Sequence, residues 1–217
     1  MIQFTTVTLL YSMGSNLSDS QFLYVDLFVT VPLSIFMGQT EAYKSLTPHL
    51  PAGSLLSIPV LTSVFGSVII QAGFQVFMFF FIKSSYWSSF YHEITIDPVD
   101  DTTACYENTS VMFISNFQYL IVCMVFSISK PFRQPLYSNL WFTLSLIILF
   151  ACNIYITISN DSFITWLLEL EQDVSMTFRL ATLVIVVVNS AVTYGFERIV
   201  VWHVSMWWKN RKDRKVI

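Results

Sequence analysis

The sequence predicts an all-α polytopic transmembrane helical bundle, with about six membrane segments over residues 1–208 and a basic tail at 209–217. Of its 217 residues, 54% are hydrophobic and only 12% are charged, whereas ordinary soluble domains carry about 25% charged residues. The mean hydropathy is +0.61. Five apolar segments are long enough to cross a hydrocarbon core of about 30 Å as helices. They lie near residues 22–38, 54–82, 110–128, 138–158 and 179–203.

A sixth apolar stretch, from Met1 to Ser12, is too short to span a membrane. At about 1.5 Å per residue it reaches roughly 18 Å, against a hydrocarbon core of about 30 Å. One interpretation is a signal peptide, but no basic region precedes it. The other is a helix that starts upstream of Met1, so that the chain is the C-terminal piece of a longer protein. Periodicity alone leaves both open.

The segment 22–38 contains an acidic residue, Asp26, and a proline, Pro32. Asp26 is the acidic residue nearest the middle of a predicted span, and a carboxylate in hydrocarbon costs about 3 kcal/mol on insertion scales. Pro32 is expected to open the helix and free a backbone carbonyl. An acidic side chain beside an opened helix predicts a cation site. The alternative is an aspartate near one interface, drawn toward headgroup water.

Prolines and aromatic residues mark the ends of the later spans. Pro48 and Pro51 prevent a continuous helix across the loop 39–53. Within the 54–82 span, Gln71 and Gln75 share one helix face, where we expect them to hydrogen-bond to other helices. Tyr and Trp prefer the headgroup level, and such anchors close the 54–82 span, open the 138–158 span and precede the tail: Tyr86, Trp87, Tyr137, Trp141, Trp202, Trp207 and Trp208.

The stretch 162–174 predicts a short amphipathic helix in the outer interface. Its apolar face is formed by Phe163, Trp166, Leu167, Leu170 and Val174. Glycosylation sequons on the same predicted side begin at Asn16, Asn108 and Asn160. Asn108 also stands at a helix start, where a capping role is the alternative.

Charged residues are divided unequally between the two predicted faces. If the spans alternate, Lys44, Lys130 and Arg133 lie on the same side as the basic tail, whereas the opposite side carries Lys83 and Arg179 together with most of the acidic residues. The positive-inside rule therefore places the C-terminus in the cytosol. An acidic outer face would concentrate cations near a binding site. The alternative explanation for these acidic residues is that they simply form a solvated loop surface.

The sequence contains no pattern typical of metal, nucleotide or nucleic-acid chemistry. Cys105, Cys123 and Cys152 lack metal or disulfide spacing, and the three histidines form no ligand cluster. There is no phosphate-binding glycine-rich loop and no nucleophile motif. A basic tail next to a span is first a topology signal and an attractor of anionic lipid. We therefore expect the lipid bilayer, and not nucleic acid, as a partner, and no cofactor held by this chain.

Five strings of residues occur in an order that matches one known family. They are Asn16-Leu-Ser-Asp-Ser-Gln-Phe-Leu-Tyr-Val-Asp-Leu27, Pro51-Ala-Gly-Ser-Leu-Leu-Ser-Ile-Pro59, Tyr106-Glu-Asn-Thr109, Phe117-Gln-Tyr-Leu-Ile121 and Lys130-Pro-Phe-Arg-Gln-Pro-Leu-Tyr137. They resemble strings in the later membrane helices of the type 5B P-type ATPases, the polyamine-transporting pumps of late endosomes and lysosomes. The resemblance runs over nearly the whole chain.

The resemblance implies that the six segments are the last six of the family's ten membrane helices, so that Met1 falls within the fifth helix and the C-terminus is cytosolic. It also implies a multi-pass protein of the late endosome or lysosome membrane. The family's Asp-Lys-Thr-Gly phosphorylation motif, its actuator domain and its proline-rich fourth helix are not found in this chain. Phosphoryl transfer requires a nucleotide site, a nucleophile and magnesium ligands. The parent pump would use ATP and magnesium, and this chain would need the missing N-terminal and cytosolic part as a partner.

The resemblance also assigns candidate residues for binding a polyamine or another organic cation. Gln3 matches a polar position on the fifth helix, and Phe22 and Asp26 match sixth-helix positions near the substrate path. A protonated amine favours a carboxylate, an amide oxygen and an aromatic face, and Phe22 and Asp26 are spaced to share a helix face. Asp19 and Gln21 are expected to line the outer mouth. For Gln3, an interhelical hydrogen bond is the alternative role.

We therefore expect a fragment of an ATP-driven polyamine or cation transporter that supplies part of the membrane substrate path and is not catalytic by itself. Two other classes of function fit the same composition. One is a small stand-alone channel or carrier. The other is a non-catalytic membrane scaffold that binds lipid or partner helices.

Overall fold

The structure is a computed structural model that describes residues 1–12, 14–43, 56–84, 105–127, 133–171 and 174–213, with side chains to residue 208. Within these ranges the regular elements are helices, apart from an isolated bridge between Ala42 and Arg133. Several predicted features lie outside the described residues: Lys44, Pro48, Pro51, Tyr86, Trp87, Lys130 and most of the acidic loop 84–108.

Five helical stretches of the described residues are long and apolar enough to cross a membrane, and Ile2–Tyr11 (α1) is a shorter apolar helix. This confirms the predicted fold class, an all-α polytopic membrane bundle. The first span joins three elements: α2 (Asp19–Leu23), the π-helix η1 (Tyr24–Thr30) and α3 (Val31–Gly38). The next spans are α4 (Ile58–Lys83), α5 (Tyr106–Phe126) and α6 (Leu140–Ile158), which follows the short turn η2 (Leu136–Ser138). After α7 (Ser162–Leu167), the last span is formed by α8 (Met176–Gly195), η3 (Phe196–Val201) and α9 (Trp202–Asp213).

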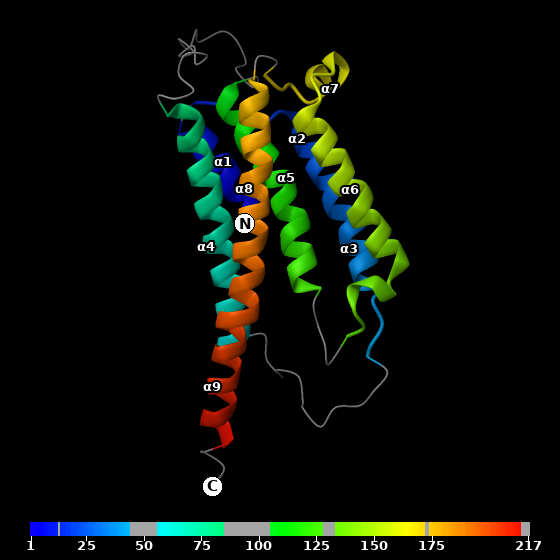
Figure 1. The fold of residues 1–217 in the computed structure, drawn as a ribbon, viewed down its shortest axis with the longest axis vertical. Helices are drawn as coiled ribbons and strands as arrows, with labels where there is room; N and C mark the ends of the chain where they lie inside the picture. Colours follow the sequence, from blue (N-terminus) through cyan, green and yellow to red (C-terminus); the bar gives the residue numbers. More distant parts are fainter. Residues whose placement is uncertain (13, 44–55, 85–104, 128–132, 172–173, 214–217) are drawn as a thin grey trace.

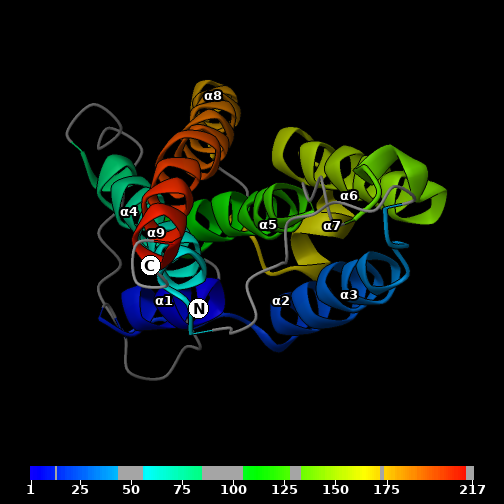
Figure 2. The same ribbon diagram turned by 90° about the horizontal axis from the view of Figure 1, so that it is seen from below.

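Helix α5 runs through the middle of the bundle (Figures 1 and 2). Seen from below in Figure 2, α1, α4 and α8 lie toward one side of α5, and α3 and α6 lie toward the other. In the most apolar stretch of α5, 72% of the residues are buried inside the protein, against 22% to 33% in the corresponding stretches of the other four spans. The other spans therefore leave broad apolar faces for lipid or for further protein.

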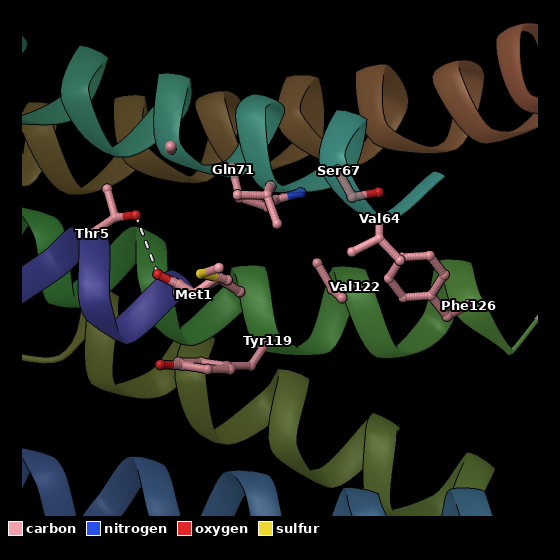
Figure 3. Close-up of a pocket in the computed structure, with 11 residues that line it drawn as sticks. Met1, Thr5, Val64, Ser67, Gln71, Tyr119, Val122 and Phe126 are labelled. Carbon is pink, nitrogen blue, oxygen red and sulfur yellow. Dashed lines mark hydrogen bonds between the residues drawn. The ribbon is translucent and has the colours of Figure 1, made fainter. Parts of the chain in front are cut away.

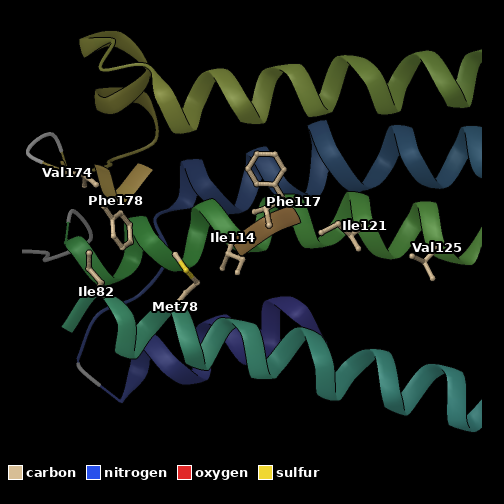
Figure 4. Packing of buried hydrophobic residues seen from close by; sticks show 9 residues of the cluster. Met78, Ile82, Ile114, Phe117, Ile121, Val125, Val174 and Phe178 are labelled. Atoms are coloured by element: carbon tan, nitrogen blue, oxygen red, sulfur yellow. The ribbon is translucent and has the colours of Figure 1, made fainter. Parts of the chain in front are cut away.

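Apolar side chains from three helices form the largest core cluster, on the α4 and α8 side of α5. Met78 and Ile82 of α4 pack with Ile114 of α5 and Phe178 of α8 (Figure 4). A separate cluster on the other side of α5 joins α3 and α6. Because α5 contributes to both clusters, its position fixes the two halves relative to each other.

Hydrogen-bonded polar side chains also join α4, α5 and α8 inside the bundle. The Gln71 amide donates to the Thr193 hydroxyl at 2.9 Å and accepts from the Asn189 amide at 3.0 Å. The Gln75 amide donates to Gln118 Oε1 at 2.8 Å. The prediction that Gln71 and Gln75 form hydrogen bonds between helices is confirmed. Because lipid hydrocarbon offers no hydrogen-bond partners, these bonds satisfy amide groups that would otherwise be unpaired in the membrane.

Pro32 does not open the helix as the sequence led us to expect. The chain continues from η1 directly into α3, and the Val31 N–H bonds to the Asp26 carbonyl, five residues earlier. Proline has no N–H with which to bond to a carbonyl four residues earlier. The regular series of backbone hydrogen bonds in the helix is therefore already interrupted at Pro32. The predicted break is instead a widened π-helical turn, an element often found at functional sites.

The predicted amphipathic helix 162–174 is shorter than expected. Helix α7 ends at Leu167, and Glu169 follows with a φ of 48°, in the left-handed region that ends a right-handed helix. Leu170, which was predicted to share an interfacial face with Trp166, is buried in the bundle, whereas Trp166 is exposed. The apolar residues of this stretch therefore face two environments: Leu170 packs in the protein core, and Trp166 lies on the exposed surface.

Two glycines of α4 provide a matched test of how this helix packs. A Cβ at Gly66 would lie 2.1 Å from a ring atom of Phe196, whereas a Cβ at Gly73 would have no atom within 4 Å. We expect Gly66→Ala to lower the free energy of unfolding by about 1–3 kcal/mol, because the ring must move. Thermal unfolding of the purified protein in detergent would measure this. Gly73→Ala gains the same helix propensity without the clash, so equal melting temperatures for the two variants would contradict this packing.

Candidate functional site

The predicted cation ligand, Asp26, lies in the π-helical turn η1, on an exposed face of the described bundle. Phe22, one turn earlier, is half-buried. Only 22% of the most apolar stretch of the first span is buried inside the protein. The face that carries Asp26 is therefore one of the broad faces that this chain leaves uncovered. A carboxylate on such a face within a membrane requires a polar or cationic partner.

Tyr119 of α5 lies beside the segments that carry Gln3 and Asp26. It lines a cavity together with Ile2 of α1 and Thr30 of η1. The structure therefore brings together α1, η1 and α5 at this point. Sequence reasoning did not select Tyr119, although the string Phe117–Ile121 that contains it was one of those that carried the resemblance.

The two residues predicted for the outer mouth differ in their surroundings. Asp19 is exposed in the first turn of α2, where the positive end of the helix dipole favours a carboxylate. Gln21 is fully buried, and its amide accepts from the Ser18 N–H at 3.3 Å and donates to the Leu168 carbonyl at 2.8 Å. Both ends of this amide are occupied, which favours a structural role for Gln21 over the predicted role in binding.

Two cavities lie beside the first residues of α1. One has a volume of about 200 Å³ between α1, α4 and α5, and its polar lining includes Thr5, Ser67, Gln71 and Tyr119 (Figure 3). The other, of about 240 Å³, lies between α1, α5 and the η1–α3 span, and Tyr119 lines it as well. Tyr119 therefore borders open volume on both sides of α1.

Within the described ranges, no group of three His, Cys, Asp or Glu residues could hold a metal ion. Burial raises the pKa of the Cys105 thiol, which keeps it protonated and poorly nucleophilic at neutral pH. Asn108 is fully buried, so its sequon cannot carry a glycan in the folded protein.

Comparison of the sequence with known proteins finds relatives among cation-transporting membrane pumps. No protein-family model matches the chain. Polyamine-transporting ATPase 13A3 of Homo sapiens is 37% identical over 216 residues, which cover 91% of this chain and 18% of that protein. The vacuolar cation-transporting ATPase YPK9 of Saccharomyces cerevisiae is 30% identical over 218 residues, covering 99% of this chain and 14% of that protein. The probable cation-transporting ATPase catp-6 of Caenorhabditis elegans is 32% identical over 218 residues, covering 100% of this chain and 17% of that protein. The chain thus spans less than a fifth of the length of these curated relatives.

Proposed function

We propose that this chain, a membrane segment homologous to part of the type 5B polyamine- and cation-transporting P-type ATPases, supplies part of the path along which such a pump moves an organic polyamine cation. The chain would form part of that path inside the membrane. Phosphorylation and nucleotide binding would occur in the part of the pump that precedes this segment, with ATP and magnesium as its cofactors.

The observation that carries the proposal is the placement of Asp26. It lies in a widened helical turn, on an exposed face of a span that this chain leaves mostly uncovered. An ionised carboxylate at such a place is costly unless a cation or a donor offsets it. A protonated amine provides both a positive charge and hydrogen-bond donors.

Direction and location complete the proposal. Alternating access coupled to phosphorylation elsewhere would move the cation from the lumen to the cytosol, and the membrane would be that of the late endosome or lysosome. The basic tail would lie in the cytosol because basic residues segregate to that side. The distribution of charge and the homology support this arrangement.

A chimeric pump tests whether this segment can serve in such a path. The homologous stretch of the human relative would be replaced by residues 1–217, and ATP hydrolysis would be measured while spermine is titrated. We expect hydrolysis that rises with spermine, because this chain supplies its share of the amine ligands. The same pump without the stretch serves as the control, and phosphoenzyme formation from ATP reports that the cytosolic part is folded.

A chimera that forms phosphoenzyme but ignores spermine would contradict the proposal. The rival functions give different results. Spermine or cation uptake by liposomes that contain only residues 1–217, without ATP, would favour a stand-alone channel or carrier. A chain that supports neither ATP-dependent nor passive transport would favour a membrane scaffold.

A further inference from the structure

We infer that a groove between α4 and α8 holds one acyl chain of an anionic phospholipid, whose headgroup contacts Lys83 at the C-terminal end of α4. The groove has a volume of about 550 Å³. Helices α4 and α8 lie side by side, on the side of α5 away from the span that carries Asp26 (Figures 1 and 2). The inference therefore concerns a different surface from the candidate cation site and does not depend on the proposed role in transport.

The first support is the shape of the groove, because α4 and the last span touch at both of its ends. At one end, Phe81 of α4 stacks on Phe178 of α8, with ring centroids 5.8 Å apart. At the other end, Gly66 lies so close to Phe196 of η3 that an added Cβ would be 2.1 Å from the ring. Between these contacts Gly73 borders open space, since an added Cβ there would have no atom within 4 Å. The groove is thus bounded along the helices and open sideways.

The second support is that the spacing of the two helices is fixed. On the inner side of the groove, the buried amide of Gln71 bonds to Thr193 at 2.9 Å and to Asn189 at 3.0 Å. These bonds and the two end contacts hold α4 and α8 in place, so the groove cannot close by a small sliding of one helix. An unfilled groove would leave its lining without dispersion contacts. The groove therefore requires an occupant in the membrane.

The third support is the chemistry of the lining, which selects an acyl chain. The walls are formed by residues of the stretches 69–77 of α4 and 185–192 of α8, and those that line the groove are aliphatic residues, phenylalanines and Gly73. Their side chains offer no partner for the hydroxyl of a sterol. The stretch 69–77 extends over about 12 Å, and a helix is about 10–12 Å in diameter with its side chains. A partner helix could only lie across the mouth, whereas a flexible acyl chain can lie inside.

The fourth support is a positive charge near one end of the groove. Lys83 stands in the last turn of α4, six residues after Phe77 and thus about 9 Å farther along the helix. Its Nζ lies 4.7 Å from the centroid of the Phe79 ring. A lysine near the end of a span extends to the headgroup level, where it attracts anionic lipid. A phospholipid whose phosphate lies at Lys83 can place one chain in the groove below.

The test measures which lipid stays bound to the chain. Residues 1–217 are reconstituted in vesicles of equal parts dioleoyl phosphatidylglycerol, dioleoyl phosphatidylcholine and cholesterol, extracted with a mild detergent, and examined by native mass spectrometry. The variants are Gly73→Leu, which fills the groove, and Lys83→Gln, which removes the charge. Gly38→Leu is the matched control, because an added Cβ at Gly38 of α3 also has no atom within 4 Å.

The unmutated chain is expected to retain one phosphatidylglycerol. Gly73→Leu should lower that amount at least about fivefold, because the leucine side chain takes the place of the acyl contacts, whereas Gly38→Leu should retain the lipid. Lys83→Gln should lower the preference for phosphatidylglycerol over phosphatidylcholine about fivefold. Equal retention in the two leucine variants would overturn the inference, as would an unchanged preference in Lys83→Gln or retention of cholesterol in place of phospholipid.

A second pair of variants guards against misfolding of Gly73→Leu. Val188→Phe fills the same groove from α8, and Val187→Phe is its control, because Val187 is 67% exposed and lies outside the groove. Added phosphatidylglycerol should raise the melting temperature in detergent of the unmutated chain and of Val187→Phe, because a ligand that binds the folded state stabilises it. The rise should be smaller in Val188→Phe, and an equal rise in both valine variants would contradict a lipid in the groove.

Discussion

Replacing Arg179 with methionine is expected to destabilise the bundle strongly. Arg179 is only 4% exposed, and its guanidinium donates to three backbone carbonyls and one side chain. Its acceptors are the Val174 carbonyl at 3.1 Å, the Thr157 and Ser159 carbonyls at 3.0 Å each, and Asn160 Oδ1 at 2.9 Å. The Phe113 ring lies 5.8 Å away. One side chain therefore ties the beginning of α8 to the end of α6 and to the top of α5.

The expected cost follows from what the variant leaves behind. The carbonyls at the C-terminal end of α6 carry the negative end of the helix dipole, and methionine would leave them without a donor. The Val174 and Thr157 carbonyls belong to buried residues, so at about 1–3 kcal/mol for each unsatisfied buried group the loss is at least about 2 kcal/mol. That is a sizeable part of the roughly 5–15 kcal/mol that stabilises an ordinary domain.

Thermal unfolding and size-exclusion profiles in detergent would measure the effect of Arg179→Met. Arg198→Met is the matched control, because Arg198 is exposed and contacts Tyr194 of its own helix. A melting temperature for Arg179→Met equal to that of the control would show that the observed bonds contribute little to stability.

Arg179 also illustrates what the sequence could and could not predict. Composition and the length of apolar runs were sufficient for the class, because a helix must satisfy its own backbone in lipid and needs a minimum length to cross it. The predicted position of Arg179 on the outer side runs against the positive-inside pattern. The structure gives the reason, which is that the cation is buried and satisfied by protein carbonyls.

The departures from prediction have local physical causes. Pro32 was expected to open its helix, but the main chain accommodates the missing donor by π-helical turns that begin at Tyr24. Leu170 was assigned to an interfacial helix by its spacing, which cannot reveal that Glu169 changes the chain direction. A hydrophobic pattern records which residues avoid water, and it does not distinguish lipid from protein core.

The candidate site was predictable only in part for the same reason. Asp26 was evident as an acidic residue in an apolar run, and Gln3 came from the resemblance. Tyr119 could not be selected, because one aromatic residue in an apolar helix looks like any other until another helix is packed against it. Gln21 was predicted to line the outer mouth, and the structure shows it as the reciprocal partner of Ser18 in a capping box.

The second large effect concerns Asp26 itself. Asp26→Asn keeps the shape of the side chain and removes its charge, so it should affect an amine ligand far more than the packing. Because a hydrogen bond to a charged group contributes about 1.5–3 kcal/mol, the half-maximal spermine concentration should rise at least about tenfold. Asp19→Asn is a matched control, since that carboxylate is exposed in the first turn of α2, and we expect a smaller change there.

The concentration of spermine that half-maximally stimulates ATP hydrolysis, compared between the chimeric pump and its Asp26→Asn variant, tests the central claim most directly. Phosphoenzyme formation from ATP in both proteins shows that each is folded. If this segment supplies the cation path, the Asp26→Asn curve will shift at least about tenfold to higher spermine or lose its stimulation. Superimposable curves from two folded pumps would contradict the claim, and Asp26 would then have only a structural role in the π-helical turn.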